Sequence, residues 1–336
     1  MTNSLAGTAG QQMDKLIAAL DSLVDGDQAV EMLIASGPLA VPHLSAFLLK
    51  GSPRTISLPR CRAARALGEL GACSTLISYF REYRPPQDAA VLFAEDAVRS
   101  AVAGELVRWK SDEVFLVLLD AARQRTTGAV VLGLGEFCRS ESVPLLFEVL
   151  EDDLCRDEAM NGLRKLPDAA RQFGILSIRG LTGVTMDGPS ARCRRRATLQ
   201  LLFALGVTPG DWPDLRRFLW EGDPGTVVAA AQLGFMIAPE TQHPEIITAL
   251  LRVAERLDFV QEEDVNRLLD AHSGIARDVA QQLERHREHA DHKSNWLSPT
   301  YRILHRVLET KKDRQTSDTP ADVQMGSEAQ HSAREN

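Results

Sequence analysis

The sequence predicts an all-α fold, an α-solenoid in which antiparallel helix pairs stack side by side. Three observations predict it: a Leu-Gly motif that returns along the chain, apolar residues at helical spacing between its copies, and a near absence of strand signals. Only 5% of the residues are aromatic, so the core is expected to consist mainly of Leu, Ala, Val and Ile. Such a core suits close helix packing better than a β-sandwich, because strands favour aromatic and β-branched residues.

The repeated motif is clearest in the segment Arg62–Gly71, and its end recurs in Gly133–Phe137. Weaker or degenerate copies complete a series of marker leucines: Leu33, Leu67, Leu106, Leu134, Leu163, Leu205 and Leu233. The steps between these markers run from 28 to 42 residues, which fits one helix–turn–helix unit per repeat with insertions in three of them. Glycine inside a helix costs up to about 1 kcal/mol relative to alanine. Its recurrence at one repeat position therefore predicts close contact between helices.

The intervals between the markers are expected to form the second helix of each unit, because their apolar residues recur at i, i+3, i+4 and i+7. These intervals are 41–49, 113–122, 142–150, 212–220 and 244–257. Prolines near their starts are compatible with a first helical turn: Pro42, Pro144, Pro213 and Pro244. Four glycines that follow apolar runs are expected to end helices: Gly51, Gly71, Gly206 and Gly222.

The segment Arg62–Gly71 resembles the HEAT-like repeats first described in phycobilisome lyases. The helices that contain Pro42 and Pro144 resemble the first helix of a HEAT unit. The resemblance covers roughly residues 12–257 and is weakest over residues 72–109. It implies the fold and leaves the function open, because such repeats occur in scaffolds, adaptors, chaperones and a few enzymes.

Four regions follow from these patterns. Residues 1–11 are expected to be a flexible N-terminus, and residues 12–257 the helical repeats. Residues 258–310 are expected to form a C-terminal helical cap, with helices at 262–269, 276–289 and 298–310. Residues 311–336 contain almost no large apolar side chains and are expected to be disordered. The sequence leaves open whether the insertions at 52–58 and 182–189 are binding loops.

Composition and charge exclude some classes of function. The net charge of −8 and the pI of about 5.6 disfavour nucleic acid as the partner. Residues 1–12 lack the basic and apolar regions of a signal peptide, and apolar runs such as Val114–Leu119 are far shorter than the roughly 20 residues that cross a bilayer. The five cysteines are odd in number and contain no CxxC pair, which favours reduced thiols and a cytoplasmic location.

No motif predicts catalysis, a cofactor or a metal. His286, His289 and His292 recur at a spacing of three, but no third zinc ligand can be identified for any neighbouring pair. The glycines of Gly133-Leu134-Gly135 lack the third glycine and the preceding strand of a dinucleotide-binding site. We therefore expect a protein that is not an enzyme and carries neither cofactor nor metal.

An arginine cluster is the first candidate binding site. Arg192, Arg195 and Arg196 share one face of a helix that is expected to begin near Pro189, through i, i+3 and i+4 spacing. Such a face could bind an acidic partner or a phosphate. The alternative is that these arginines pair with acidic residues of the preceding repeat, such as Asp157 and Glu158.

Two further pairs of residues are candidates for partner binding. Arg62 and Arg65 belong to a second basic group with Arg54 and Arg60, and they flank the apolar face of their helix. The alternative to binding for this group is a solvated face or pairing with Glu95 and Asp96 of another repeat. Tryptophan is enriched in binding hot spots, which makes candidates of Trp212 and Trp220. The alternative for both is packing at repeat junctions.

The expected function is therefore that of a protein-binding scaffold whose partner carries acidic segments. The segments Arg62–Gly71, Thr127–Cys138, Cys193–Gly206 and Gly225–Ala238 would line its concave side. The alternative is enzymatic and rests on the resemblance alone. Phycobilisome lyases imply attachment of a bilin to a protein cysteine, and HEAT-like DNA glycosylases imply binding of damaged duplex DNA in a basic groove, which the acidic composition disfavours.

Overall fold

The computed structural model describes residues 2–50, 55–180 and 188–272, together with residues 281, 300, 302–303 and 305–306. Within these ranges the regular elements are all helical and no strand occurs, which confirms the all-α prediction. The chain forms two compact units. Unit 1 consists of residues 1–176 and 189–197, and unit 2 of residues 177–188 and 198–336.

Unit 1 contains ten complete helices within the described ranges. They are α1 (Thr2–Ala19), α2 (Gly26–Ala35), α3 (Val41–Lys50), α4 (Leu58–Glu69), α5 (Cys73–Glu82), α6 (Ala89–Leu106), α7 (Asp112–Gln124), α8 (Gly128–Glu136), α9 (Val143–Val149) and α10 (Arg156–Arg164). Two helices contribute residues to both units, α11 (Pro167–Gly180) and α12 (Pro189–Leu205). Unit 2 continues with α13 (Trp212–Arg216), α14 (Pro224–Ile237), α15 (His243–Val253) and α16 (Phe259–Ala271).

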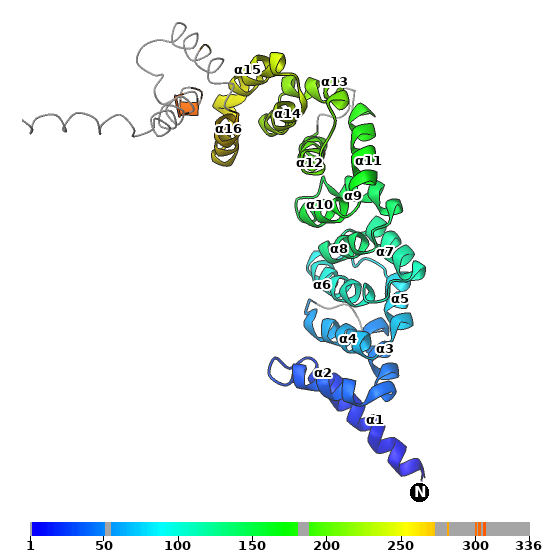
Figure 1. Cartoon of the computed structure of the whole chain (residues 1–336). Coiled ribbons are helices and arrows are strands. Elements are labelled where there is room, and N and C mark those ends of the chain that lie inside the picture. The colour runs from blue at the N-terminus through cyan, green and yellow to red at the C-terminus, as the bar shows by residue number, and fades with distance from the viewer. Residues whose placement is uncertain are drawn as a thin grey trace, which may run out of the picture. The chain divides into compact units, whose positions relative to one another are not determined.

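The helices of unit 1 pack in two rows (Figure 1). In one row α2, α4, α6, α8 and α10 contact one another in succession. In the other row α1, α3, α5 and α7 do the same. Each helix also packs against a helix of the opposite row, as α3 does against α4 and α7 against α8. The row formed by α2, α4, α6, α8 and α10 is called the inner row below.

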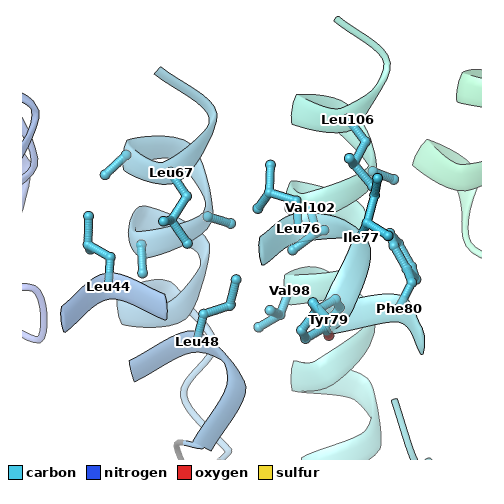
Figure 2. Packing of buried hydrophobic residues seen from close by; sticks show 14 of the residues in the cluster. Leu44, Leu48, Leu67, Leu76, Ile77, Tyr79, Phe80, Val98, Val102 and Leu106 are labelled. Atoms are coloured by element: carbon cyan, nitrogen blue, oxygen red, sulfur yellow. The ribbon is translucent and has the colours of Figure 1, made fainter. Parts of the chain in front are cut away.

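Leucines at helical spacing fill the space between the rows. Leu44 and Leu48 of α3 lie on one face of their helix, and both are fully buried together with Leu67 of α4. Figure 2 shows them in one cluster with Leu76 of α5 and, farther along it beside Ile77, Leu106 of α6; Leu76 and Leu106 are also fully buried. Burying a leucine side chain contributes about 1.5–3 kcal/mol. The marker leucines Leu67 and Leu106 therefore belong to the core.

Prolines and capping residues set the helix ends largely as expected. Pro144, Pro213 and Pro244 lie in the first turns of α9, α13 and α15, and Pro42 is the second residue of α3. Gly71 and Gly206 end helices with positive φ angles of 73° and 77°, a conformation that favours glycine. Gly222 does not adopt this conformation, and Gly51 lies outside the described residues.

Two of the recurring glycines bring neighbouring helices into backbone contact. A Cβ atom on Gly135 of α8 would lie 2.7 Å from the Cα atom of Gly162 of α10. A Cβ atom on Gly162 would lie 3.2 Å from the Cα atom of Gly135. The first distance is too short for any side chain and the second is tighter than most Cβ contacts, so glycine at position 135 is required for the approach of α8 to α10.

The two ends of the chain were assigned to a flexible N-terminus and a C-terminal cap. α1 begins at Thr2, so residues 2–11 of the expected N-terminal region are helical. α16 corresponds to the first of the three helices expected in the C-terminal cap. The helix expected at 276–289 and much of that at 298–310 fall outside the described residues, as do the tail 311–336 and, within the two insertions, residues 52–54 and 182–187.

In the described part of the chain, no single helix combines the length and apolarity needed to cross a membrane. Two consecutive helical segments, 26–35 and 37–50, meet that test only when taken together, and they are bent by 116° relative to each other.

The cysteines are all unpaired thiols, and the burial of Cys155 is expected to make stability depend on pH. Cys155 is buried, and this burial, together with Asp152 and Glu158, raises the pKa of its thiol from 9.0 to about 12. The native thiol stays protonated where the unfolded thiol ionises. The raised pKa therefore contributes stability that is fully present below pH 9 and is lost as the pH rises toward 12, at up to about 1.4 kcal/mol per pH unit.

Replacing Cys155 with alanine is accordingly expected to make the free energy of unfolding fall less steeply as the pH rises above 9. Urea unfolding at pH 8, 9 and 10 checks this. The wild-type protein should lose up to about 1.4 kcal/mol more than the variant between pH 9 and pH 10. An identical pH dependence in the two proteins would show that the burial of Cys155 does not control its ionisation.

Candidate partner-binding surfaces

Ion pairs connect consecutive helices of the inner row. Arg65 of α4 pairs with Glu31 of α2 at 3.2 Å. Arg108, just after α6, pairs with Glu69 of α4 at 2.8 Å. Lys165, just after α10, pairs with Glu136 of α8. Exposed pairs of this kind stabilise a protein little. Their consequence is a face of alternating charge, in which Arg65 already has an acidic partner on a neighbouring helix.

Arg62 is a buried residue of unit 1, and it is therefore not available to bind a partner. It is only 7% exposed. Its Nη1 atom donates hydrogen bonds to the carbonyl oxygens of Leu20, at 2.9 Å, and Ser22, at 2.8 Å, and its Nε atom donates to Asp27 at 3.0 Å. The guanidinium therefore satisfies the carbonyl groups of the turn between α1 and α2, where a partner cannot reach it.

A buried polar cluster links α4, α5 and α6, and Tyr79 is the member that the sequence did not indicate. Arg60 of α4 is paired with Glu95 of α6 and also donates to the carbonyl oxygen of Leu48 at 2.9 Å. The hydroxyl of Tyr79 of α5 donates to the same carboxylate. Burial, reinforced by the charge of Glu95, raises the pKa of Tyr79. Pairing with Glu95 was the alternative considered for the basic group Arg54, Arg60, Arg62 and Arg65, and Arg60 is the member that forms this pair.

The arginine cluster of α12 is divided between the interior and the surface. Arg195 is 4% exposed, so the structure removes it from the candidate binding residues. Arg194 pairs with Glu151 at 2.9 Å, which is the kind of pairing with a preceding repeat that was the alternative to partner binding. Arg192 is exposed and Arg196 is half-buried. Only these two remain as surface candidates, four residues apart on one face.

The two tryptophans of unit 2 have different environments. Trp212 is 3% exposed, donates its Nε1 hydrogen to Gln242 at 2.6 Å, and packs against Gly234, where a Cβ atom would lie 2.6 Å from the indole ring. It is a core residue and not a binding residue. Trp220 is 51% exposed, with its Nε1 atom 3.2 Å from Glu245 and the guanidinium of Arg252 over its ring. Trp220 therefore stays a surface candidate.

A cavity of about 720 Å³ opens where the C-terminal ends of α1 and α3 meet the N-terminal ends of α4 and α6. Its wall is mainly apolar and includes Ile17, Phe47, Ile56, Pro59 and Val91. Sequence reasoning did not find it, because its residues come from four helices and none of them belongs to a motif. The one hint was the insertion at 52–58, whose described residue Ile56 forms part of the wall.

The charged groups of this cavity are Arg60, Asp14 and Asp21. The charge of Arg60 is balanced by Glu95. Asp14 is exposed and has the Nδ1 atom of His43 at 3.4 Å, and Asp21 is exposed with no ion pair in the described part of the chain. The charge that a ligand would meet at the cavity is therefore negative.

Two further observations bear on chemistry. The described residues contain no group of three or more His, Cys, Asp or Glu side chains placed to hold a metal ion. The chain matches no model of a known protein family and no curated protein. The function must therefore be argued from the surfaces themselves.

Proposed function

We propose that this chain is a HEAT-like α-solenoid that acts as a non-enzymatic protein-binding scaffold. The observation that carries the proposal is the succession of contacts along the two rows of unit 1. Stacked helix pairs bury a continuous core and leave an extended face, which repeat proteins use to bind other macromolecules. The ends of such an array are open, so the surface is not limited to one cleft.

The charges of the inner row favour a protein over a nucleic acid. A phosphate backbone requires a run of unpaired cations, since the affinity comes from many phosphate contacts. Arg65, Arg108 and Lys165 are each paired with a carboxylate of the same face. This alternation suits the polar rim of a protein interface.

Within this proposal, Arg192 and Arg196 are the contact for an acidic segment of the partner. Both reach the surface from one face of α12, and neither forms an ion pair among the residues that the structure describes. An exposed guanidinium binds a carboxylate through two parallel hydrogen bonds, which gives orientation as well as attraction.

A photo-cross-linking experiment in the native cell tests this function. A benzophenone amino acid at the exposed Ser190, two residues before Arg192 in α12, is expected to capture a discrete protein through an acidic peptide, identified by mass spectrometry. The double variant Arg192→Glu, Arg196→Glu should lower recovery of that protein at least tenfold, because two attractive charges become repulsive. Arg123→Glu, which changes an exposed arginine of α7, is the matched control and should leave recovery unchanged. Equal recovery with the double variant would contradict the assignment.

A further inference from the structure

The cavity bounded by α1, α3, α4 and α6 exposes apolar surface that no other residue in the described part of the chain covers. Ile56 is 61% exposed although it forms part of the cavity wall. Ile17, Phe47 and Val91 are only half-buried there. Apolar surface left in water costs about 25 cal/mol per Å² relative to its burial. A ligand that covers this wall therefore gains affinity from the apolar contact alone.

The size of the cavity suits more than one side chain. Ligand sites commonly enclose about 300–1,000 Å³, and a volume of about 720 Å³ lies in that range. Its wall combines aromatic, branched and proline surface, which fits a large apolar anchor. Peptides that bind through such anchors place one or two large apolar residues in a pocket and keep the flanking residues at the rim.

The charges decide which flanking residues fit. Arg60 does not offer a free positive charge, because Glu95 and the carbonyl oxygen of Leu48 occupy its guanidinium. Asp14, on the exposed side of α1, and Asp21, two residues beyond its C-terminal end, remain as the charges of the cavity. Two carboxylates beside an apolar wall repel anionic ligands and attract cations within a few ångströms.

We propose that this cavity docks a segment of a partner protein in which a large apolar side chain is flanked by lysine or arginine. The apolar side chain contacts Phe47 and Ile56, and the basic residues pair with Asp14 and Asp21. The inference extends the proposed protein-binding function to a second surface whose charge is opposite to that of Arg192 and Arg196. The scaffold would then hold an acidic segment and a basic, apolar one at different places.

Fluorescence anisotropy with two labelled peptides tests the proposal on the full-length protein. One peptide has a Leu-Trp-Leu centre flanked by lysines, and the other has the same centre flanked by glutamates. The lysine peptide is expected to bind at least tenfold more tightly at low salt, and its advantage should shrink at high salt because screening weakens exposed charges. The variant Asp14→Lys, Asp21→Lys should lose at least tenfold in affinity for it, and Ile56→Glu should lose affinity for both peptides.

Control variants separate this proposal from the proposed function. Asp168→Lys reverses an exposed carboxylate of unit 1 that is not part of the cavity wall and should bind the lysine peptide normally. Arg192→Glu, Arg196→Glu should also bind it normally, so a loss of the native partner in that variant tests only the first surface. Equal affinity for the two peptides, or unchanged binding by the Asp14, Asp21 variant, would overturn the proposal. Concentration-dependent dimerisation abolished by the same variant would overturn it too, by assigning the cavity to a second copy.

Discussion

The variant Glu95→Ala is expected to lose about 3–5 kcal/mol of unfolding free energy, because removing one partner of a buried ion pair leaves the other charge buried and uncompensated. Glu95 is 4% exposed and accepts from both Arg60 and Tyr79. Without it, the guanidinium of Arg60 keeps only its bond to Leu48, and the hydroxyl of Tyr79 loses its acceptor. Equilibrium urea unfolding followed by circular dichroism measures the change.

Two comparisons make this expectation specific. Glu31→Ala removes an exposed carboxylate that also pairs with an arginine of α4, and it should cost about 1 kcal/mol or less. In a double-mutant cycle with Arg60→Met, the cost of Glu95→Ala should fall, because no buried charge is then left behind. A loss near that of Glu31→Ala would show that the cluster is hydrated and does not link α4, α5 and α6.

The second large effect is expected at the contact of α8 with α10. Gly135→Ala places a methyl group 2.7 Å from the Cα atom of Gly162, which is backbone and cannot rotate away. The two helices must therefore separate, and overpacking of this kind costs about 1–3 kcal/mol or more. Thermal unfolding of the variant should show a lower midpoint, and hydrogen exchange should be faster in α8 and α10 than in α2 and α4.

A second glycine-to-alanine substitution, in a helix of the same row, is expected to raise the stability of the protein instead of lowering it. Gly104 is an exposed residue of α6, and a Cβ atom there meets nothing within 4 Å. Gly104→Ala should therefore stabilise the protein by up to about 1 kcal/mol, as alanine does inside a helix. If both substitutions stabilised it, the close approach of α8 and α10 would be contradicted.

The pattern of apolar residues predicted the helices well, because the spacing of apolar residues within a segment identifies the face of the helix that packs into the core. The segment Thr127–Cys138 became α8, Gly128–Glu136, and Gly225–Ala238 became α14, Pro224–Ile237. The helix expected at Arg62–Gly71 begins four residues earlier, at Leu58, which had been placed at the end of the insertion 52–58. α6 is 18 residues long, although its marker at Leu106 is degenerate.

The candidate site was harder to predict, because contacts between repeats depend on the register of one helix against the next. Spacing placed Arg192, Arg195 and Arg196 on one face, but only the packed structure shows that Arg195 faces inward. In the same way, nothing local separates Arg60, Arg62 and Arg65, which are respectively paired with Glu95, Asp27 and Glu31. The cavity depends on four helix ends, and the insertion at 52–58 was the only segment that hinted at it.

The most direct test of the repeat architecture is a set of distances along the inner row of unit 1. Nitroxide labels can be placed in pairs on exposed residues, with Asn161 of α10 as the common member and Leu132 of α8, Gly104 of α6 or Arg65 of α4 as the other. Neighbouring packed helices lie about 8–10 Å apart. Double electron–electron resonance should therefore show the distance from the label at Asn161 increasing by about that amount at each step from α8 to α6 to α4. A label on α4 as close to α10 as the label on α8 would contradict a solenoid and indicate a closed bundle.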